Sequence, residues 1–173
     1  MLSNVKESLD TFAKRVISRS RANLTKKKKN VSKKLYDSLD YDLKVHKNSF
    51  SLKILMEKYA DFQDKGVSGT ERKYSTPYSY KSSSNLLGFE LATSTFAKWA
   101  KLRGIRFRSV GGQFAKGNYK TIGVAIALAK KKKGIKPTHF FSKPFESAFK
   151  DLPSELVESF SLDIQQFLKF TTK

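Results

Sequence analysis

"YDLKVHKNSFSLKILM", residues 41–56, alternates apolar and polar side chains on both sides of a polar centre. The apolar positions are Tyr41, Leu43 and Val45 before the centre, and Phe50, Leu52, Ile54 and Met56 after it. Such alternation around a polar turn at residues 47–49 predicts a β-hairpin with one buried face.

The segments on either side of this hairpin have the residue spacing of helices. Residues 3–21 place Val5, Leu9, Phe12 and Val16 on one helical face. Residues 89–102 and 119–132 predict two central helices. Their expected buried positions are Leu91, Phe96, Trp99, Leu102, Ile122, Val124, Ala125, Ile126 and Leu128.

Two prolines mark two further helices near the C-terminus. Pro144 suits a first turn, and a last helix after Pro153 carries an apolar stripe of Leu156, Phe160, Ile164, Phe167 and Leu168. The sequence therefore predicts an α+β fold, in which a small antiparallel sheet is flanked by N-terminal, central and C-terminal helices.

The expected domain organisation has two parts. Residues 1–30 form an amphipathic helix followed by a basic segment, which is either a second helical turn or an exposed linker. Residues 31–173 form one α+β domain. Within it, Gly66 and Gly69 predict a turn that needs glycine, and residues 68–85 predict a long loop.

Basic residues outnumber acidic ones by 35 to 15, which gives a net charge of +20. Residues 1–35 contribute +9 and residues 98–150 contribute +13, whereas residues 36–97 are neutral and residues 151–173 come to −2. A compact fold with this charge repels itself unless a polyanion binds it, and nucleic acid is the first candidate. If the two basic blocks meet in space, they form one basic surface.

The residues expected to face nucleic acid are the two lysine runs and the basic residues near them. They are Lys26, Lys27, Lys28, Lys29, Lys33, Lys34, Arg103, Arg106, Arg108, Lys130, Lys131, Lys132 and Lys133. Lysine runs contact phosphates without reading bases, so they predict binding without sequence preference. The alternative is that each run is only a solvated surface.

The sequence predicts neither a catalytic site nor a bound metal or cofactor. There is no cysteine, and His46 and His139 lack partners at metal-ligand spacing. Asp40 and Asp42 are expected on the exposed side of their strand, which disfavours a two-metal site. "GGQFAKGNYK" lacks the ending of a phosphate-binding loop. The longest apolar run, residues 124–129, is too short to cross a bilayer, so a soluble protein made in the cytoplasm is expected.

An aromatic segment follows the second lysine run directly. It predicts that Phe140, Phe141 and Phe145 anchor the end of the 119–132 helix to the sheet, so that Lys130–Lys133 project at a fixed position.

Three motifs, in this order, resemble the tail-completion, or tail-terminator, neck proteins of tailed bacteriophages. The first comprises Leu35, Ser38 and Leu39, the second Tyr59, Ala60, Phe62 and Gly66, and the third Pro137, Phe140, Phe141, Pro144 and Phe145. The resemblance covers about residues 31–168. The family's glycine before the first leucine is absent, and its acidic residue is shifted to Asp64.

This resemblance implies a structural subunit of the head–tail connector in the virion. Such subunits assemble into a six- or twelvefold homo-oligomeric ring, contact portal, adaptor or tail proteins, and let duplex DNA pass through the lumen. The basic residues would then line the channel. The alternatives are a free, sequence-nonspecific nucleic-acid-binding protein, an enzyme acting on nucleic acid through Asp40 or Asp42, and, more remotely, a protein of the membrane surface.

Overall fold

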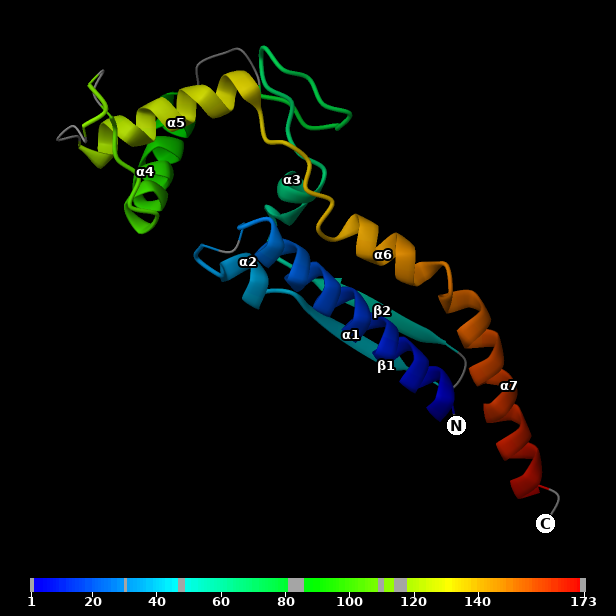
Figure 1. The fold of residues 1–173 in the computed structure, drawn as a ribbon. Coiled ribbons are helices and arrows are strands. Elements are labelled where there is room, and N and C mark those ends of the chain that lie inside the picture. Colours follow the sequence, from blue (N-terminus) through cyan, green and yellow to red (C-terminus); the bar gives the residue numbers. More distant parts are fainter. Residues whose placement is uncertain are drawn as a thin grey trace. The chain divides into compact units, whose positions relative to one another are not determined.

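The computed structural model describes residues 2–29, 31–46, 49–80, 86–108, 111–113 and 118–171. Its elements, in chain order, are α1 (Ser3–Lys26), α2 (Lys34–Asp37), β1 (Asp40–Val45), β2 (Phe50–Leu55), α3 (Ala60–Asp64), α4 (Leu86–Leu102), α5 (Tyr119–Lys133), α6 (Ser142–Phe149) and α7 (Leu152–Thr171) (Figure 1). The predicted α+β class is confirmed, because helices flank an antiparallel pair of strands.

The chain forms two compact units. Residues 1–60 and 139–173 form the first, here called the terminal unit, and residues 61–138 form the second, the central unit. These bounds differ from the expected division at residue 30, because α1 packs against the hairpin within the terminal unit.

The predicted hairpin is confirmed, with β1 and β2 paired antiparallel. Leu43 lies opposite Leu52, and Tyr41 lies opposite Ile54. Leu43, Leu52 and Ile54 are half-buried and pack against the core beneath α1. Phe50 was expected on the same buried face, but its side chain is 48% exposed. It lies at the first position of β2, at the end of the ladder, and lines an open groove there.

Helix α1 is the central element of the terminal unit. It contacts β1 and β2 as well as α6 and α7. The predicted face is confirmed, since Val5, Leu9, Phe12 and Val16 are each at most 2% exposed. The helix runs five residues beyond its predicted end because Leu24, which is fully buried, continues this face.

A second core cluster surrounds the first residue of the predicted aromatic segment. Phe140 is 0% exposed and packs with Ile17, Leu24, Leu35 and Leu39. Its backbone oxygen accepts a hydrogen bond from the Asn23 side chain at 3.3 Å. Phe140 therefore attaches the start of the 139–173 segment to the core formed by α1 and α2.

The N-terminus of α1 is capped by a residue far away in the sequence. Asp163 of α7 is 4% exposed and accepts hydrogen bonds from the backbone N–H groups of Asn4 and Val5, both at 3.1 Å. The side chains of Ser3 and Asn4 donate to the same carboxylate at 3.2 and 2.8 Å. Burial raises the pKa of Asp163, but these hydrogen bonds lower it further, so that the pKa lies below its ordinary value. The cap fixes α7 against α1.

The lowered pKa of Asp163 predicts a loss of stability in acid. Because the folded-state pKa lies below the unfolded one, the carboxylate stabilises the fold at neutral pH, and this stability is lost as the pH falls through the folded pKa. We expect Asp163→Asn to lower the free energy of unfolding by about 1–3 kcal/mol at pH 7. The difference from the parent protein should shrink below about pH 4.

Thermal unfolding of both proteins between neutral and acid pH measures this difference. Glu146→Gln, an exposed acid of α6, is the matched control and should leave the pH profile unchanged. A difference at Asp163 that stays constant down to strongly acid pH would contradict the prediction.

Candidate nucleic-acid interface

Helices α4 and α5 of the central unit approach each other closely at a glycine. A Cβ atom added to Gly123 would lie 2.4 Å from the backbone oxygen of Thr93 and 2.9 Å from the backbone nitrogen of Ala97. No side chain larger than hydrogen fits there without moving a helix. The contact joins α5, which carries the second lysine run, to α4.

Several predicted core positions of these two helices are wrong. Trp99 is 37%, Leu102 69% and Leu128 46% exposed, and Ala125 is also exposed. Ile122 is buried as predicted, and the other buried residues are Thr93, Ala100, Gly123 and Ala127. A close crossing selects small residues for the contact and leaves larger side chains outside. Phe96, Val124 and Ile126 are half-buried, and the side chain of Leu91 lies outside the described residues.

The lysine run ends α5, and the segment after Gly66 caps its carbonyl groups. The backbone oxygen of Lys131 accepts from the N–H of Thr70 at 2.9 Å, and that of Lys132 accepts from the N–H of Glu71 at 3.0 Å. The last carbonyls of a helix lack partners within it. This cap satisfies two of them and ties the run to the 66–72 segment.

Two glycines make the cap possible. A Cβ atom on Gly69 would lie 2.0 Å from the backbone oxygen of Lys132, and one on Gly134 would lie 2.2 Å from that of Val67. Gly134 also has φ +73°, which favours glycine. Val67 and Ile135 exchange both backbone hydrogen bonds, at 2.9 and 2.8 Å. The long loop, where it is described up to residue 80, thus begins as a clamp on the end of α5.

This clamp, rather than the aromatic segment, is the observed support of the lysine run. Phe140, Phe141 and Phe145 belong to the terminal unit, whereas the run belongs to the central unit. Lys132 and Lys133 are exposed, and Lys130 and Lys131 are partly exposed. Lys132 pairs with Glu71 at 3.0 Å, but both side chains are at least 60% exposed, so the pair is worth at most about 1 kcal/mol.

The three predicted arginines lie in the connection between α4 and α5. Arg103 stacks its guanidinium over the Trp99 ring, 5.3 Å from the centroid. Gly104, with φ +62°, ends α4, and Arg106 and Arg108 beyond it are exposed. The arginines therefore come before the start of α5, whereas Lys130–Lys133 form the last turn of α5.

The first lysine run ends α1. Lys28 has φ +53°, and the N–H of Lys29 donates to the backbone oxygen of Leu24, which closes the helix. The run is therefore the terminating turn of α1, not a second helix. Lys26, Lys27, Lys28, Lys29, Lys33 and Lys34 are all exposed, and Lys34 pairs with Glu57 at 3.4 Å.

A groove of about 860 Å³ in the terminal unit brings further cations beside this run. It is lined by Lys14, Arg21 and Lys26 of α1, with Tyr36 and Tyr41 among the residues across it. Arg21 donates to the backbone oxygens of Tyr36 and Leu39 at 3.2 and 2.9 Å, and lies over the Tyr36 ring. The sequence did not single out Lys14 or Arg21.

Asp10 balances part of this charge. It pairs with Lys14 at 2.6 Å and accepts a hydrogen bond from the Tyr41 hydroxyl. Hydrogen bonding from Lys14, followed by that from Tyr41, lowers the pKa of Asp10, and the bond to Asp10 raises the pKa of Tyr41.

The first lysine run and its neighbours lie in the terminal unit, whereas the arginines and the second lysine run lie in the central unit. That all of these cations form one basic surface stays a prediction.

Residues of the three resembling motifs mostly occupy structural positions. Leu35, Leu39 and Phe140 share one core cluster. The Ser38 hydroxyl donates to the Leu35 oxygen and accepts from the Glu57 N–H, at 3.1 and 3.2 Å. Gly66 has φ +78°, as its predicted turn requires. The remaining motif residues are buried at Ala60 and Pro144, half-buried at Pro137, Phe141 and Phe145, and exposed at Tyr59 and Phe62.

The described residues offer little for metal chemistry. No three His, Asp or Glu side chains among them are grouped as a metal site. The Nδ1 atom of His139 lies 3.4 Å from the Ser142 hydroxyl, and His46 is exposed near the hairpin turn. Asp42 pairs with Lys44 of its own strand at 3.6 Å.

Within the described part of the chain, none of the helices combines the length and the apolar character that a bilayer span requires.

Comparisons with protein-family models, with curated proteins and with solved structures found no match to this chain. The resemblance to connector proteins therefore depends on the three motifs alone.

Proposed function

We propose that this protein is a structural subunit of a bacteriophage head–tail connector ring, which contacts duplex DNA through phosphates and without sequence preference. The observation that carries the proposal is the clamped last turn of α5. Four consecutive lysines end a helix whose final carbonyls are capped by the 66–72 segment. Cations on a fixed helix end can contact a passing polyphosphate without a shape change.

The rest of the charge supports the same function. Arg103, Arg106 and Arg108 add cations to the central unit, and Lys26–Lys29 with Lys14 and Arg21 add them to the terminal unit. The net charge of +20 is typical of a partner for polyanions. On this proposal the protein resides in the virion, beside portal, adaptor or tail proteins.

Replacing Lys130–Lys133 with glutamine should weaken duplex binding and make it less dependent on salt. Each lysine that neutralises a phosphate contributes about 0.9 to the slope of log K against log salt. We therefore expect the slope to fall by about 2–4. Fluorescence anisotropy with two unrelated duplexes at several salt concentrations measures both slope and sequence preference.

The control removes the same charge elsewhere. Lys53, Lys58, Lys143 and Lys150 are exposed residues of the terminal unit outside the lysine runs. Replacing these four with glutamine should change the slope by less than about 1. Equal slopes for the two variants would mean that general charge, not the α5 run, binds the duplex.

The connector role needs a separate test. Immunogold labelling and negative-stain images of purified virions should place the protein at the neck, and the purified protein with portal or adaptor should form rings. A protein that binds duplex DNA with the expected slope, yet is absent from virions and forms no ring, would instead be the free nucleic-acid-binding alternative.

A further inference from the structure

Helix α7 carries an apolar stripe that the described structure leaves largely exposed. Val157 is 72%, Phe160 49%, Ile164 43% and Phe167 61% exposed. These residues recur at intervals of three, four and three, which is the heptad spacing of a helix that packs along another helix. The sequence predicted the stripe at Phe160, Ile164 and Phe167 but left its exposure open.

A neighbouring face of α7 is already occupied by α1, and this contact fixes which face of α7 is exposed. Asp163 caps α1, the Ser159 and Ser8 hydroxyls hydrogen-bond at 2.5 Å, and Arg15 pairs with Glu155 at 3.4 Å. At about 100° per residue, the stripe lies roughly a third of a turn around the helix from these contacts. Rotation of α7 to bury the stripe would break the Asp163 cap.

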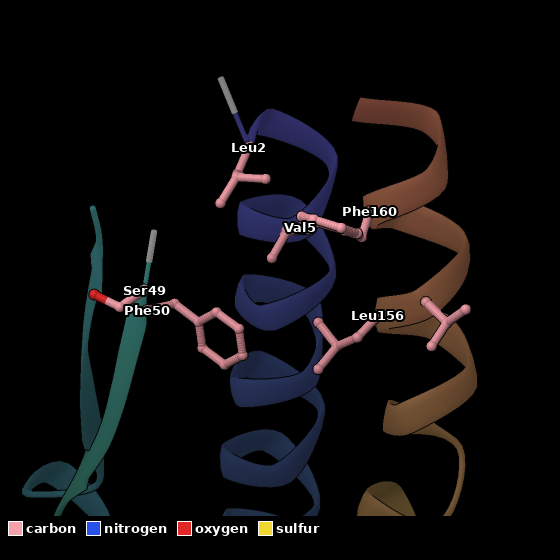
Figure 2. A pocket seen from close by; sticks show the side chains of 7 residues that line it. Leu2, Val5, Ser49, Phe50, Leu156 and Phe160 are labelled. Atoms are coloured by element: carbon pink, nitrogen blue, oxygen red, sulfur yellow. The ribbon is translucent and has the colours of Figure 1, made fainter. Parts of the chain in front are cut away.

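Two residues of the stripe, Val157 and Phe160, line an open apolar groove of about 540 Å³ together with Leu156. Figure 2 shows Leu156 and Phe160 extending from α7 toward α1, with Val5 on α1 and Phe50 on β2 lining the same groove. A helix that packs along the stripe would therefore also contact this groove, where Phe50 is 48% exposed.

Charge indicates what kind of partner fits this face. Residues 151–168 contain no lysine or arginine, although the chain has 35 of them. Lys6 of α1 lies beside Ile164 and Phe167 at one end of the stripe, but α7 itself offers nucleic acid no cation over these residues, and its exposed Glu158 would repel a phosphate. For a second copy of a +20 chain, by contrast, residues 151–168 are a segment whose own side chains bring no cations together on close approach.

We propose that the α7 stripe binds the α7 stripe of a second copy of this chain, helix against helix. Such a contact is self-complementary, since the same apolar residues face each other across a twofold axis. The inference goes beyond the proposed function, because it holds for a connector subunit and for a free DNA-binding protein alike.

Sedimentation velocity of the nuclease-treated, full-length protein over a range of micromolar concentrations tests the proposal. The parent protein should form dimers or larger species as concentration rises. The double variant Val157→Asp, Phe167→Asp should weaken this association at least about tenfold. Both positions are more than 60% exposed, so circular dichroism should show an unchanged fold.

The matched control lies on the same helix. Leu162 is 45% exposed and lies outside the stripe, so Leu162→Asp should change association less than about twofold. A second measurement uses the absence of cysteine from the chain. Ser161→Cys, at the middle of the stripe's length, should form disulfide-linked dimers on mild oxidation, whereas Ser147→Cys on α6 should not.

A parent protein that stays monomeric throughout, or equal losses from Leu162→Asp and the double variant, would overturn the proposal. Equal crosslinking at residues 161 and 147 would do the same. Duplex binding is measured in parallel on the same samples. If binding shows no dependence on the α5 lysines while self-association persists, the proposed function fails and this inference stands.

Discussion

Replacing Phe140 with alanine is expected to lower the free energy of unfolding by about 3–5 kcal/mol. Its ring is completely buried among Ile17, Leu24, Leu35 and Leu39. Alanine would remove that apolar contact and leave a cavity that helices α1 and α2 can fill only partly. Urea unfolding followed by circular dichroism measures the loss.

Phe149→Ala is the matched control, because the Phe149 ring is 50% exposed and stacks with Phe145. It should cost less than about 1.5 kcal/mol. A loss at Phe140 no larger than that at Phe149 would show that the Phe140 ring is not buried in solution.

A leucine at Gly123 should destabilise the α4–α5 pair by about 3 kcal/mol or more. Its Cβ atom would overlap the backbone of Thr93 and Ala97, at 2.4 and 2.9 Å. Backbone atoms cannot rotate away as side-chain ends can, so the helices must separate. Hydrogen exchange should show faster exchange of backbone amides throughout α4 and α5.

Ala125→Leu on the same helix provides the comparison, because Ala125 is exposed. The variant places the same leucine side chain on an exposed face of α5 and should leave amide protection in α4 unchanged. Normal protection of α4 in the Gly123 variant would mean that the two helices do not meet at this glycine.

Local pattern was enough to predict most elements of the terminal unit, although it did not predict α2. The alternation around residues 47–49 predicted the hairpin, and the spacing of Val5, Leu9, Phe12 and Val16 predicted the buried face of α1, because both depend on near neighbours in the sequence. The same reasoning failed at Trp99 and Leu102. The close helix crossing at Gly123 places small residues in the contact and leaves larger ones outside it. The spacing of apolar residues does not reveal a crossing made by a glycine.

The residues that shape the candidate sites act across long sequence distances. Gly69 contacts the end of α5, more than sixty residues later, and Asp163 caps a helix that begins at Ser3. The sequence marked Gly69 only as a turn residue, without its contact to α5, and it did not mark Asp163. A carboxylate among the apolar residues of a C-terminal helix was the one available signal for Asp163, since buried acids need partners.

The order of the two units along the chain has a consequence for synthesis. All of residues 61–138 emerge from the ribosome before the last part of the terminal unit, residues 139–173. The central unit can therefore assemble from a nascent chain, whereas α1 must wait for Phe140, α6 and α7 with its apolar face only partly covered. Premature termination anywhere before residue 140 would leave that face exposed to chaperones and proteases.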